Sequence, residues 1–408
     1  MSSANIKALN VLRGIAVLAI LVRHAWGLFG SPDIRILAVN FAPWINQMSA
    51  AVDLFFVLSG VVLAISFVSS GAGVSPNSTV RFLVSRVIRI APAYWLALTL
   101  VLIFFTPQFI ESENINSPLG LHRFLVFVGF VQQFDPLAFG AFAPLSPFWT
   151  LSVEMAFYLL IPVLVKIVRV LGTWKALVAS FGASISWLLL VASRPPWVLE
   201  TISNYCSLRN QECGSDFIVF MMSHQIPAYL FHFVAGIAIG CAFVEGKRLQ
   251  SARLAKTLII VGAIVAIGWM WVLGTLSIRA EFWNPFNYIK LQNMDANIYF
   301  YGESLVYASA FAVLCVGLIY SGRSKNNWLE RLLSFYGNIG YSVYLLHMPL
   351  LFALIRTDLF QKLANGPFRI LTLPLLTLVV ITVVSWIYFR AVESPLHQKA
   401  RAFMRREK

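Results

Sequence analysis

A histidine and two arginines interrupt an almost unbroken apolar stretch near the start of the chain, LRGIAVLAILVRHAW (12–26). Arg13 and His24 are about three helical turns apart, so they share one helix face and lie roughly 16 Å apart along its axis. We expect Arg13 at one edge of a bilayer and His24 deep within it, where ionisable groups are usually kept for function. His24 is the candidate general base. A basic flank with a buried, hydrogen-bonded histidine is the structural alternative.

Two carboxylates lie near the outer ends of later apolar stretches. Asp53 is in AVDLFFVLSG (51–60), at a depth expected to match that of His24, where it could orient the imidazole and stabilise its charged form. Glu154 lies about two turns into SPFWTLSVEMAFYLLIPVL (146–164), where a carboxyl group needs a partner or a proton. A helix cap for Asp53 and a neutral, packed Glu154 are the structural alternatives.

Arg86 and Arg89 lie three positions apart in RFLVSRVIRIAPAYW (81–95), on one helix face of the expected cytoplasmic surface. Arginine binds phosphate groups through two parallel hydrogen bonds, so this spacing suits a phosphate or pyrophosphate ligand. The alternative is that these arginines only mark the cytoplasmic side of the membrane.

Three more side chains are candidates for a substrate pocket. Trp149 precedes Glu154, and Tyr344 and His347 share a helix face in GNIGYSVYLLHMPLL (337–351). A packed histidine is the alternative for His347. The remaining histidines are assigned to loops, span ends or the tail and given no role: His122, His224, His232 and His397.

The composition indicates a polytopic membrane protein. Of 408 residues, 59% are hydrophobic and only 12% are charged, which exceeds what a soluble domain needs. The net charge of +14 does not indicate nucleic-acid binding, because the basic residues punctuate apolar runs instead of forming a face. No P-loop, nucleophile elbow or metal-ligand spacing is present, so no metal site is expected. The first apolar run lacks a cleavage site and should be retained.

Ten apolar runs of roughly 20 residues predict an all-α transmembrane bundle. They centre on 8–28, 48–69, 92–110, 148–168, 174–193, 224–244, 254–276, 299–320, 339–358 and 367–390. The segment 121–134 is too short to span comfortably and fits a re-entrant or interfacial helix better. One domain is expected over 1–408, with its core at about 8–395 and no appended soluble domain.

The basic residues predict the orientation of the chain. With the N-terminus inside, 21 of the 31 Lys and Arg residues fall on the cytoplasmic side, so both termini should be cytoplasmic. The loop 194–223 is then outside. It contains Cys206 and Cys213, for which a disulfide and two free thiols are both open.

Taken in order, the motifs resemble the acyltransferase-3 family of integral-membrane acyltransferases, which acylate bacterial surface glycans and some antibiotics. They are RGIA with Arg13 and His24, VDLFFVLSG (52–60), SRVIRIAPAYW (85–95), FWTLSVE (148–154), YSVYLLHMPL (341–350) and VESP (392–395). The departures are Ala51 for a usual Gly, Ala91 for a frequent Tyr, Met155 for a common second Glu and Ser394 for the usual Arg. Met155 means that Glu154 must act without a neighbouring carboxylate.

The resemblance implies an O-acyltransferase of the bacterial cytoplasmic membrane. It would move an acyl group, most simply acetyl, from cytoplasmic acyl-CoA to a hydroxyl of an exported or lipid-linked glycan such as lipopolysaccharide or exopolysaccharide. Arg13, Arg86 and Arg89 would bind the nucleotide phosphates at the inner edge. His24, with Asp53 and Glu154 towards the outer side, would act directly as a base or carry the acyl group covalently; both routes are open. No bound cofactor is expected.

A multi-pass transporter or flippase of a glycan or small molecule is the competing interpretation. Such a protein would also contain about ten spans with buried charges. Transporters often contain inverted repeats with paired broken helices, and the sequence shows no repeat of this kind.

Overall fold

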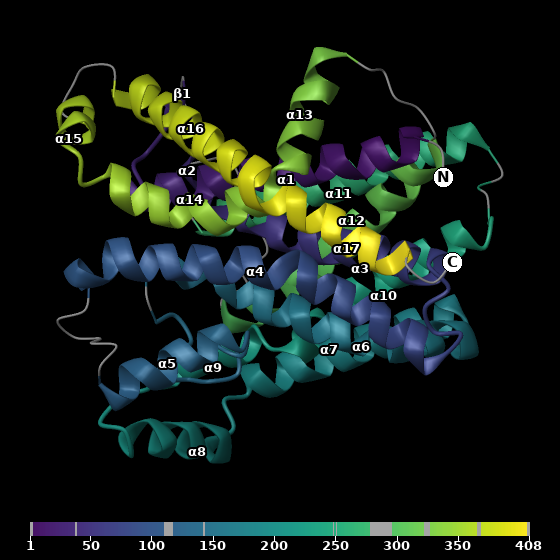
Figure 1. Ribbon diagram of the computed structural model, residues 1–408, viewed down its shortest axis with the longest axis horizontal. Helices are drawn as coiled ribbons and strands as arrows, with labels where there is room; N and C mark the ends of the chain where they lie inside the picture. Colours follow the sequence, from purple (N-terminus) through teal and green to yellow (C-terminus); the bar gives the residue numbers. More distant parts are fainter. Residues whose placement is uncertain are drawn as a thin grey trace. The chain divides into compact units, whose positions relative to one another are not determined.

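A computed structural model describes residues 3–36, 39–109, 117–141, 143–247, 249, 251–277, 296–321, 327–364 and 369–405. These residues are mostly helical (Figure 1), as the apolar runs predict. The exception to the helical pattern is a two-residue antiparallel ladder between β1 (Arg35–Ile36) and β2 (Val39–Asn40). The all-α prediction is therefore confirmed.

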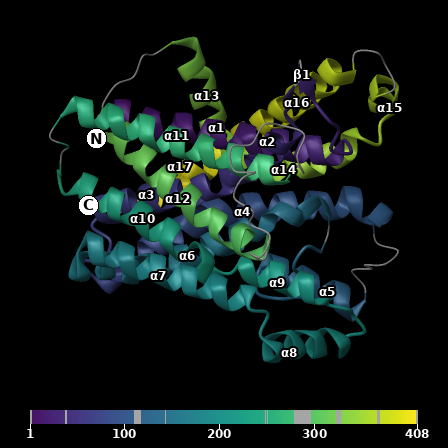
Figure 2. The same ribbon diagram turned by 180° about the vertical axis from the view of Figure 1, so that it is seen from behind.

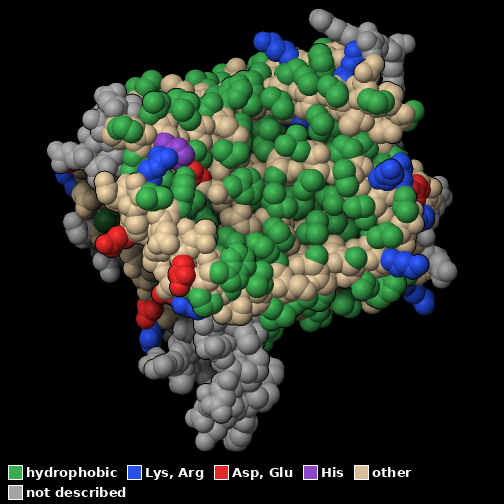
Figure 3. Space-filling model, turned by 90° about the horizontal axis from the view of Figure 1, so that it is seen from below, with side chains coloured by type: hydrophobic (Ala, Val, Ile, Leu, Met, Phe, Trp, Pro, Cys, Tyr) green, Lys and Arg blue, Asp and Glu red, His purple; other side chains and the backbone are tan. Residues whose placement is uncertain are grey.

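Nine helices within these ranges are long and apolar enough to cross a membrane, or ten if α13 and α14 form one broken span. This agrees with the predicted number of spans. Most side chains on the face drawn in Figure 3 are hydrophobic, with the charged ones towards its margins. The protein is a multi-pass membrane protein.

The third span differs from its predicted bounds of 92–110. Helix α4 (Pro76–Phe109) begins well before that range, so Arg86 and Arg89 lie inside a membrane-length helix and not in a connection before it. The predicted span began after the arginines because it followed the apolar run, and unpartnered charge is costly in a bilayer. In the structure, Arg89 has a polar partner and Arg86 lies over an aromatic ring, so the helix can continue through both.

The chain divides into two compact units, and unit 1 comprises Met1–Ser66, Val163–Ser193 and Pro227–Asn338. Its elements before the second stretch are α1 (Ser3–Leu28), β1, β2, α2 (Ala42–Asn46), the 3-10 turn η1 (Gln47–Ala50) and most of α3 (Ala51–Ser69). They are followed by the end of α6 (Trp149–Leu171), α7 (Thr173–Ala192), α10 (Ile226–Val244), α11 (Ala252–Ser277), α12 (Ala296–Ser321) and α13 (Trp328–Asn338). Helix α1 packs against α13, and α11 packs against α12.

Helices α3 and α10 of unit 1 meet along a line of glycines, which we call the glycine seam: Gly60, Gly236 and Gly240. A Cβ atom added to Gly236 would lie 2.2 Å from the carbonyl oxygen of Val57, and one on Gly60 would lie 2.5 Å from that of Phe233. Side chains are therefore excluded, and the two backbones touch. Small residues at such contacts are typical of packed membrane helices.

Unit 2 comprises Phe67–Pro162, Arg194–Ile226 and Ile339–Lys408. Its elements are α4, α5 (Pro118–Val128), the 3-10 helix η2 (Ala143–Phe148), the start of α6, α8 (Pro196–Ser207), α9 (Ser215–Ser223), α14 (Gly340–Leu354), α15 (Asp358–Ala364), α16 (Arg369–Tyr388), the π turn η4 (Phe389–Glu393) and α17 (Ser394–Arg405). Turns of the π type inside helices often mark functional positions.

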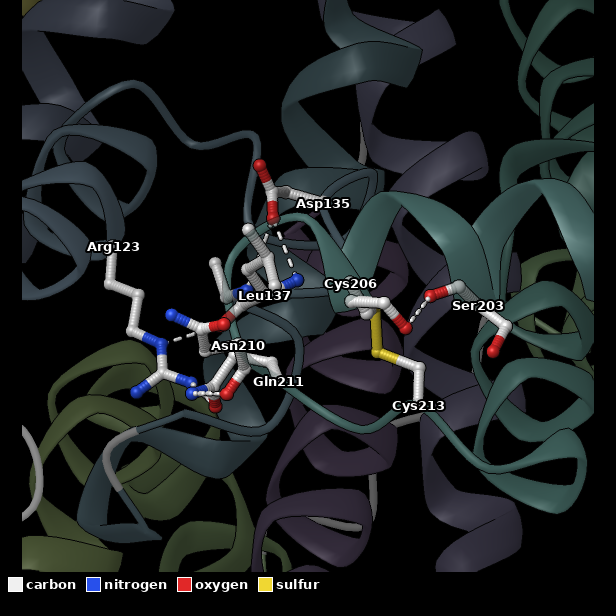
Figure 4. Close-up of a disulfide and its surroundings, with 10 residues drawn as sticks. Arg123, Asp135, Leu137, Ser203, Cys206, Asn210, Gln211 and Cys213 are labelled. Atoms are coloured by element: carbon white, nitrogen blue, oxygen red, sulfur yellow. Dashed lines mark hydrogen bonds between the residues drawn. A yellow bond between two sulfur atoms is a disulfide. The ribbon is translucent and has the colours of Figure 1, made fainter.

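A disulfide in unit 2 joins Cys206, at the end of α8, to Cys213 in the connection to α9, which resolves the choice between a disulfide and two thiols (Figure 4). Nearby, the buried Arg123 of α5 donates to the carbonyl oxygen of Leu137 at 2.5 Å and to Oε1 of Gln211 at 3.4 Å. Helix α5 has 11 residues and ends at Val128. At 1.5 Å per residue it is too short to cross a bilayer, as the sequence predicted for 121–134.

Candidate active site

Arg13 and His24 both lie on α1, as predicted, and both side chains are partly buried. The residue beside His24 fixes this end of the helix. Nε of Arg23 donates to the carbonyl oxygen of Asn46 at 3.1 Å, and its guanidinium lies 5.4 Å from the ring centre of Trp26. Since Asn46 precedes the turn that leads into α3, the His24 end of α1 is held near the start of the helix that carries Asp53.

Asp53 lies in the first turn of α3 and belongs to a buried polar cluster in unit 1. Its Oδ1 accepts from Nε2 of His232 on α10 at 2.8 Å and from Oγ of Ser304 on α12 at 2.5 Å. Oγ of Ser304 is also 2.9 Å from Nε2 of His232. We call these three residues the Asp53 cluster. The predicted pairing of Asp53 with His24 stays a prediction.

The place given to His232 in the sequence analysis is wrong. It does not lie in a loop or at a span end but in the interior of α10, where it is 0% exposed. The signal was available, because an ionisable side chain inside a membrane-length apolar run is a candidate functional group by default. Its Nδ1 atom has no hydrogen-bond partner among the described residues.

Glu154 and the arginine pair belong to unit 2. Tyr158, one turn further along α6, donates to Oε1 of Glu154 at 2.6 Å. Electrostatic interactions also link Tyr158 to Arg86 and Arg89. The acid and the two arginines therefore lie in one neighbourhood, whereas they were predicted to lie towards opposite sides of the membrane. The prediction differed because α4 begins before the arginines, so that Arg86 and Arg89 lie within this helix and not in the connection before it.

A second polar network in unit 2 joins three motifs that are far apart in the sequence. Nε of Arg89 donates to Nε2 of His397 at 2.8 Å, and Oγ of Ser342 donates to Oε2 of Glu393 at 2.6 Å. Nε2 of His397 lies 3.4 Å from Oε1 of Glu393, which is 1% exposed at the end of the π turn. We call these four residues the Glu393 network. His397, which lies in the tail of the sequence, was predicted to have no role.

The predicted pocket residues also lie in unit 2. The ring of Trp149 packs edge-on against that of His224 with centroids 4.8 Å apart. Tyr344 is hydrogen-bonded to Thr150 and to the carbonyl oxygen of Pro147. Nδ1 of the buried His347 donates to the carbonyl oxygen of Tyr344 at 2.7 Å. These contacts fix the three rings in place. A role of these residues in substrate binding stays a prediction.

The fold, the Asp53 cluster and the Glu393 network define a class: multi-pass membrane proteins with partnered acids, imidazoles and arginines inside apolar helices. Ionisable side chains at such positions usually serve chemistry or transport. Among the described residues, no group of three or more His, Cys, Asp or Glu side chains could hold a metal ion. The family model described as Acyltransferase domain matches residues 6–390, so the chain belongs to this acyltransferase family. The family predicted from the motifs is confirmed, and the protein is an acyltransferase.

Three curated relatives are similar over different shares of the chain. Nodulation protein 10 of Rhizobium leguminosarum bv. viciae is 26% identical over 87% of this chain and 85% of its own length. O-acetyltransferase OatA of Staphylococcus aureus is 21% identical over 98% of this chain but 59% of its own length. Peptidoglycan O-acetyltransferase OatA of Listeria monocytogenes is 26% identical over 38% of this chain and 24% of its own. No solved structure matches the chain.

Proposed function

We propose that this acyltransferase is an O-acetyltransferase of the bacterial cytoplasmic membrane, and that it acetylates hydroxyl groups of an exported or lipid-linked glycan. The observation that supports acyl transfer most strongly is the family match over 6–390. The acetyl group and the glycan acceptor are inferred from relatives named as O-acetyltransferases, one of them of peptidoglycan. The donor is inferred to be acetyl-CoA, or a related acyl-CoA, on the cytoplasmic side.

In the proposed reaction, the acceptor hydroxyl attacks the thioester carbonyl while His24 takes the hydroxyl proton. The oxygen–carbon bond forms, the carbon–sulfur bond breaks, and the proton then passes to the departing thiolate of CoA. General-base catalysis of this kind contributes about 10²–10⁴-fold in rate. Asp53 would stabilise the imidazolium that forms during transfer. A role in the reaction is also proposed for Glu154.

The arginines are proposed to bind the phosphate groups of the donor. The guanidinium of Arg86 lies 4.6 Å from the ring centre of Phe82, which holds a planar donor group in one orientation. Arg89 uses Nε for His397, and its two Nη groups are the donors proposed for phosphate. A role in binding the donor phosphates is also proposed for Arg13.

The test adds labelled acetyl-CoA to one face of the membrane at a time. Acetyl-CoA is supplied to inside-out vesicles and to right-side-out vesicles that contain the full chain, and labelled envelope glycan and released CoA thiol are measured. Label transfer in the inside-out vesicles alone is expected. Vesicles with the His24→Gln protein are the matched control. Mass spectrometry of the labelled glycan identifies the acyl group and the sugar together.

Two other outcomes contradict the proposal. Label transfer from acetyl-CoA supplied to the outer face would place the donor on the wrong side. No transfer in either preparation, combined with counterflow of a glycan substrate, would favour the transporter interpretation.

A further inference from the structure

The hydrogen-bond directions in the Asp53 cluster exclude a nucleophilic serine. In a Ser–His–Asp hydrolase site, the carboxylate holds one imidazole nitrogen and the serine hydroxyl donates to the other. Here Asp53 and Ser304 both lie against Nε2 of His232, and the hydroxyl of Ser304 donates to the carboxylate. Nε2 must therefore carry the proton that Oδ1 of Asp53 accepts. It cannot take another from Ser304.

Asp53 is the member of the pair that a ligand can reach. Its side chain is 11% exposed, whereas that of His232 is 0% exposed. A residue that acts on the substrate has to touch it. The burial of His232 therefore suits a residue that acts through Asp53.

The carboxylate of Asp53 needs donors to stay charged and fixed in this environment. Burying a carboxylate is costly unless it is hydrogen-bonded. The two bonds from His232 and Ser304 both end on Oδ1, so they hold this oxygen in place and limit rotation of the carboxylate.

The backbone also holds this arrangement in register. Helices α3, α10 and α12 lie side by side in the views of Figures 1 and 2. Gly236 is one turn after His232 on α10, and it contacts the backbone of α3 one turn after Asp53. The Asp53–His232 pair therefore lies one helical turn before the contact between Gly236 and Val57. At that contact the two helix backbones already touch and cannot come closer.

We propose that His232 and Ser304 are positioning residues for acyl transfer: they anchor Oδ1 of Asp53 and so direct Oδ2 towards the imidazole of His24. This inference rests on the proposed function, in which His24 is the base and Asp53 stabilises its charged form. The hydrogen bond from Arg23 to the carbonyl oxygen of Asn46 supports this inference, because it holds the neighbour of His24 close to the start of α3, which carries Asp53. A base whose partner is fixed in advance reacts faster than one whose partner must be oriented.

The test uses the full chain, purified from membranes, with acetyl-CoA as donor and envelope glycan as acceptor. His232→Leu removes the donor to Asp53, and we expect kcat to fall about 10-fold or more with the KM for acetyl-CoA unchanged. His232→Gln places an amide N–H near the former Nε2, and should restore kcat to within about threefold of wild type. Ser304→Ala should lower kcat by less than His232→Leu.

Ser309→Ala is the matched control for Ser304→Ala on the same helix. The hydroxyl of Ser309 donates to the carbonyl oxygen of Leu305 within α12, at 2.8 Å, so its loss should leave kcat unchanged. Thermal melting of each purified variant separates loss of folding from loss of positioning, because kcat is expressed per folded protein.

Three results would overturn the inference. Unchanged kcat in both His232→Leu and Ser304→Ala would show that Asp53 needs no positioning. A folded His232→Gln protein as inactive as His232→Leu would make His232 itself the base. A wild-type protein with no acyl transfer would end the proposed function as well, whereas the first two results leave that function standing.

Discussion

Both units bury a carboxylate next to an imidazole, but the hydrogen bonds run in opposite directions. In unit 1, the imidazole of His232 donates to Asp53. In unit 2, the imidazole of His397 accepts from Arg89 and lies 3.4 Å from Glu393. A guanidinium can only donate, so Nε2 of His397 carries no proton and this imidazole is neutral.

This difference separates two uses of the same side chains. The charges of Arg89 and Glu393 offset each other within the Glu393 network, which therefore suits holding helices together and orienting an arginine. The Asp53 cluster places two donors on one carboxylate oxygen, which suits fixing an anion for another group. A histidine beside a carboxylate is thus not enough to identify a catalytic pair; the donor of each bond decides.

The largest loss of acetyl transfer is expected from substitution of His24, the proposed base. His24→Gln should lower acetyl transfer by about 10²–10⁴-fold, because an amide cannot take up a proton at neutral pH. The measurement is label transfer per folded protein. His122→Gln is the control, since His122 on α5 of unit 2 pairs with Asp135 at 2.7 Å and should not affect transfer. Near-normal transfer by a well-expressed His24→Gln protein would reject the base, and His347 would become the next candidate.

A paired substitution tests the two carboxylates directly. Asp53→Asn should lower kcat by about 10–100-fold with little change in melting temperature, because it removes a charge that stabilises the imidazolium. Glu393→Gln should instead destabilise the protein by about 1–3 kcal/mol, since it leaves Arg89 with less compensation near a buried site. Melting curves and kcat are measured for both proteins. Equal effects on rate and stability in the two variants would remove the distinction drawn between the units.

The arginine pair should affect donor binding more than turnover. Arg86→Ala or Arg89→Ala should weaken acetyl-CoA binding by about 1.5–3 kcal/mol through loss of a charge-assisted phosphate contact. Arg81→Ala is the control on the same helix; its guanidinium lies over the ring of Phe403 at 5.7 Å. Binding is measured by calorimetry on the purified chain. If the Arg86→Ala/Arg89→Ala double mutant binds acetyl-CoA as tightly as wild type, the arginines serve only the orientation of the chain in the membrane and the packing of its helices.

The smallest effect on transfer is expected from the disulfide. Replacing Cys206 and Cys213 by Ser should cost about 2–3 kcal/mol of stability, at the low end for a native disulfide because the closed loop is short, and should leave kcat near wild type. The same bond reports topology. On intact cells, an impermeant reductant followed by an impermeant maleimide should label both cysteines, since 194–223 is predicted outside. Labelling only after permeabilisation would reverse the orientation.

Most of the fold could be predicted because membrane spans are long apolar runs. The start of α4 could not, because the sequence shows the charges of Arg86 and Arg89 but not the groups that offset them. Those groups include His397, which is 308 positions from Arg89 in the chain. Charge inside a helix is tolerated once a partner is present, and the partner is a tertiary property.

The candidate site was predictable only in part. Asp53 stands out as an acid in an apolar helix, and His232 carries the same signal within 224–244. Ser304 carries no signal, because a serine in a membrane helix is ordinary and bonds most simply to its own backbone. Its role depends on a contact with a residue 251 positions away.

The glycine seam has a consequence for how the protein responds to its lipid surroundings. Bilayers differ in thickness, and a membrane helix adapts by tilting or by deforming the lipid around it. Because α3 and α10 touch backbone to backbone at Gly60, Gly236 and Gly240, neither helix can tilt alone without opening that contact. A thinner or thicker bilayer would tilt them together, so the distance between Asp53 and His232 should not change with lipid composition.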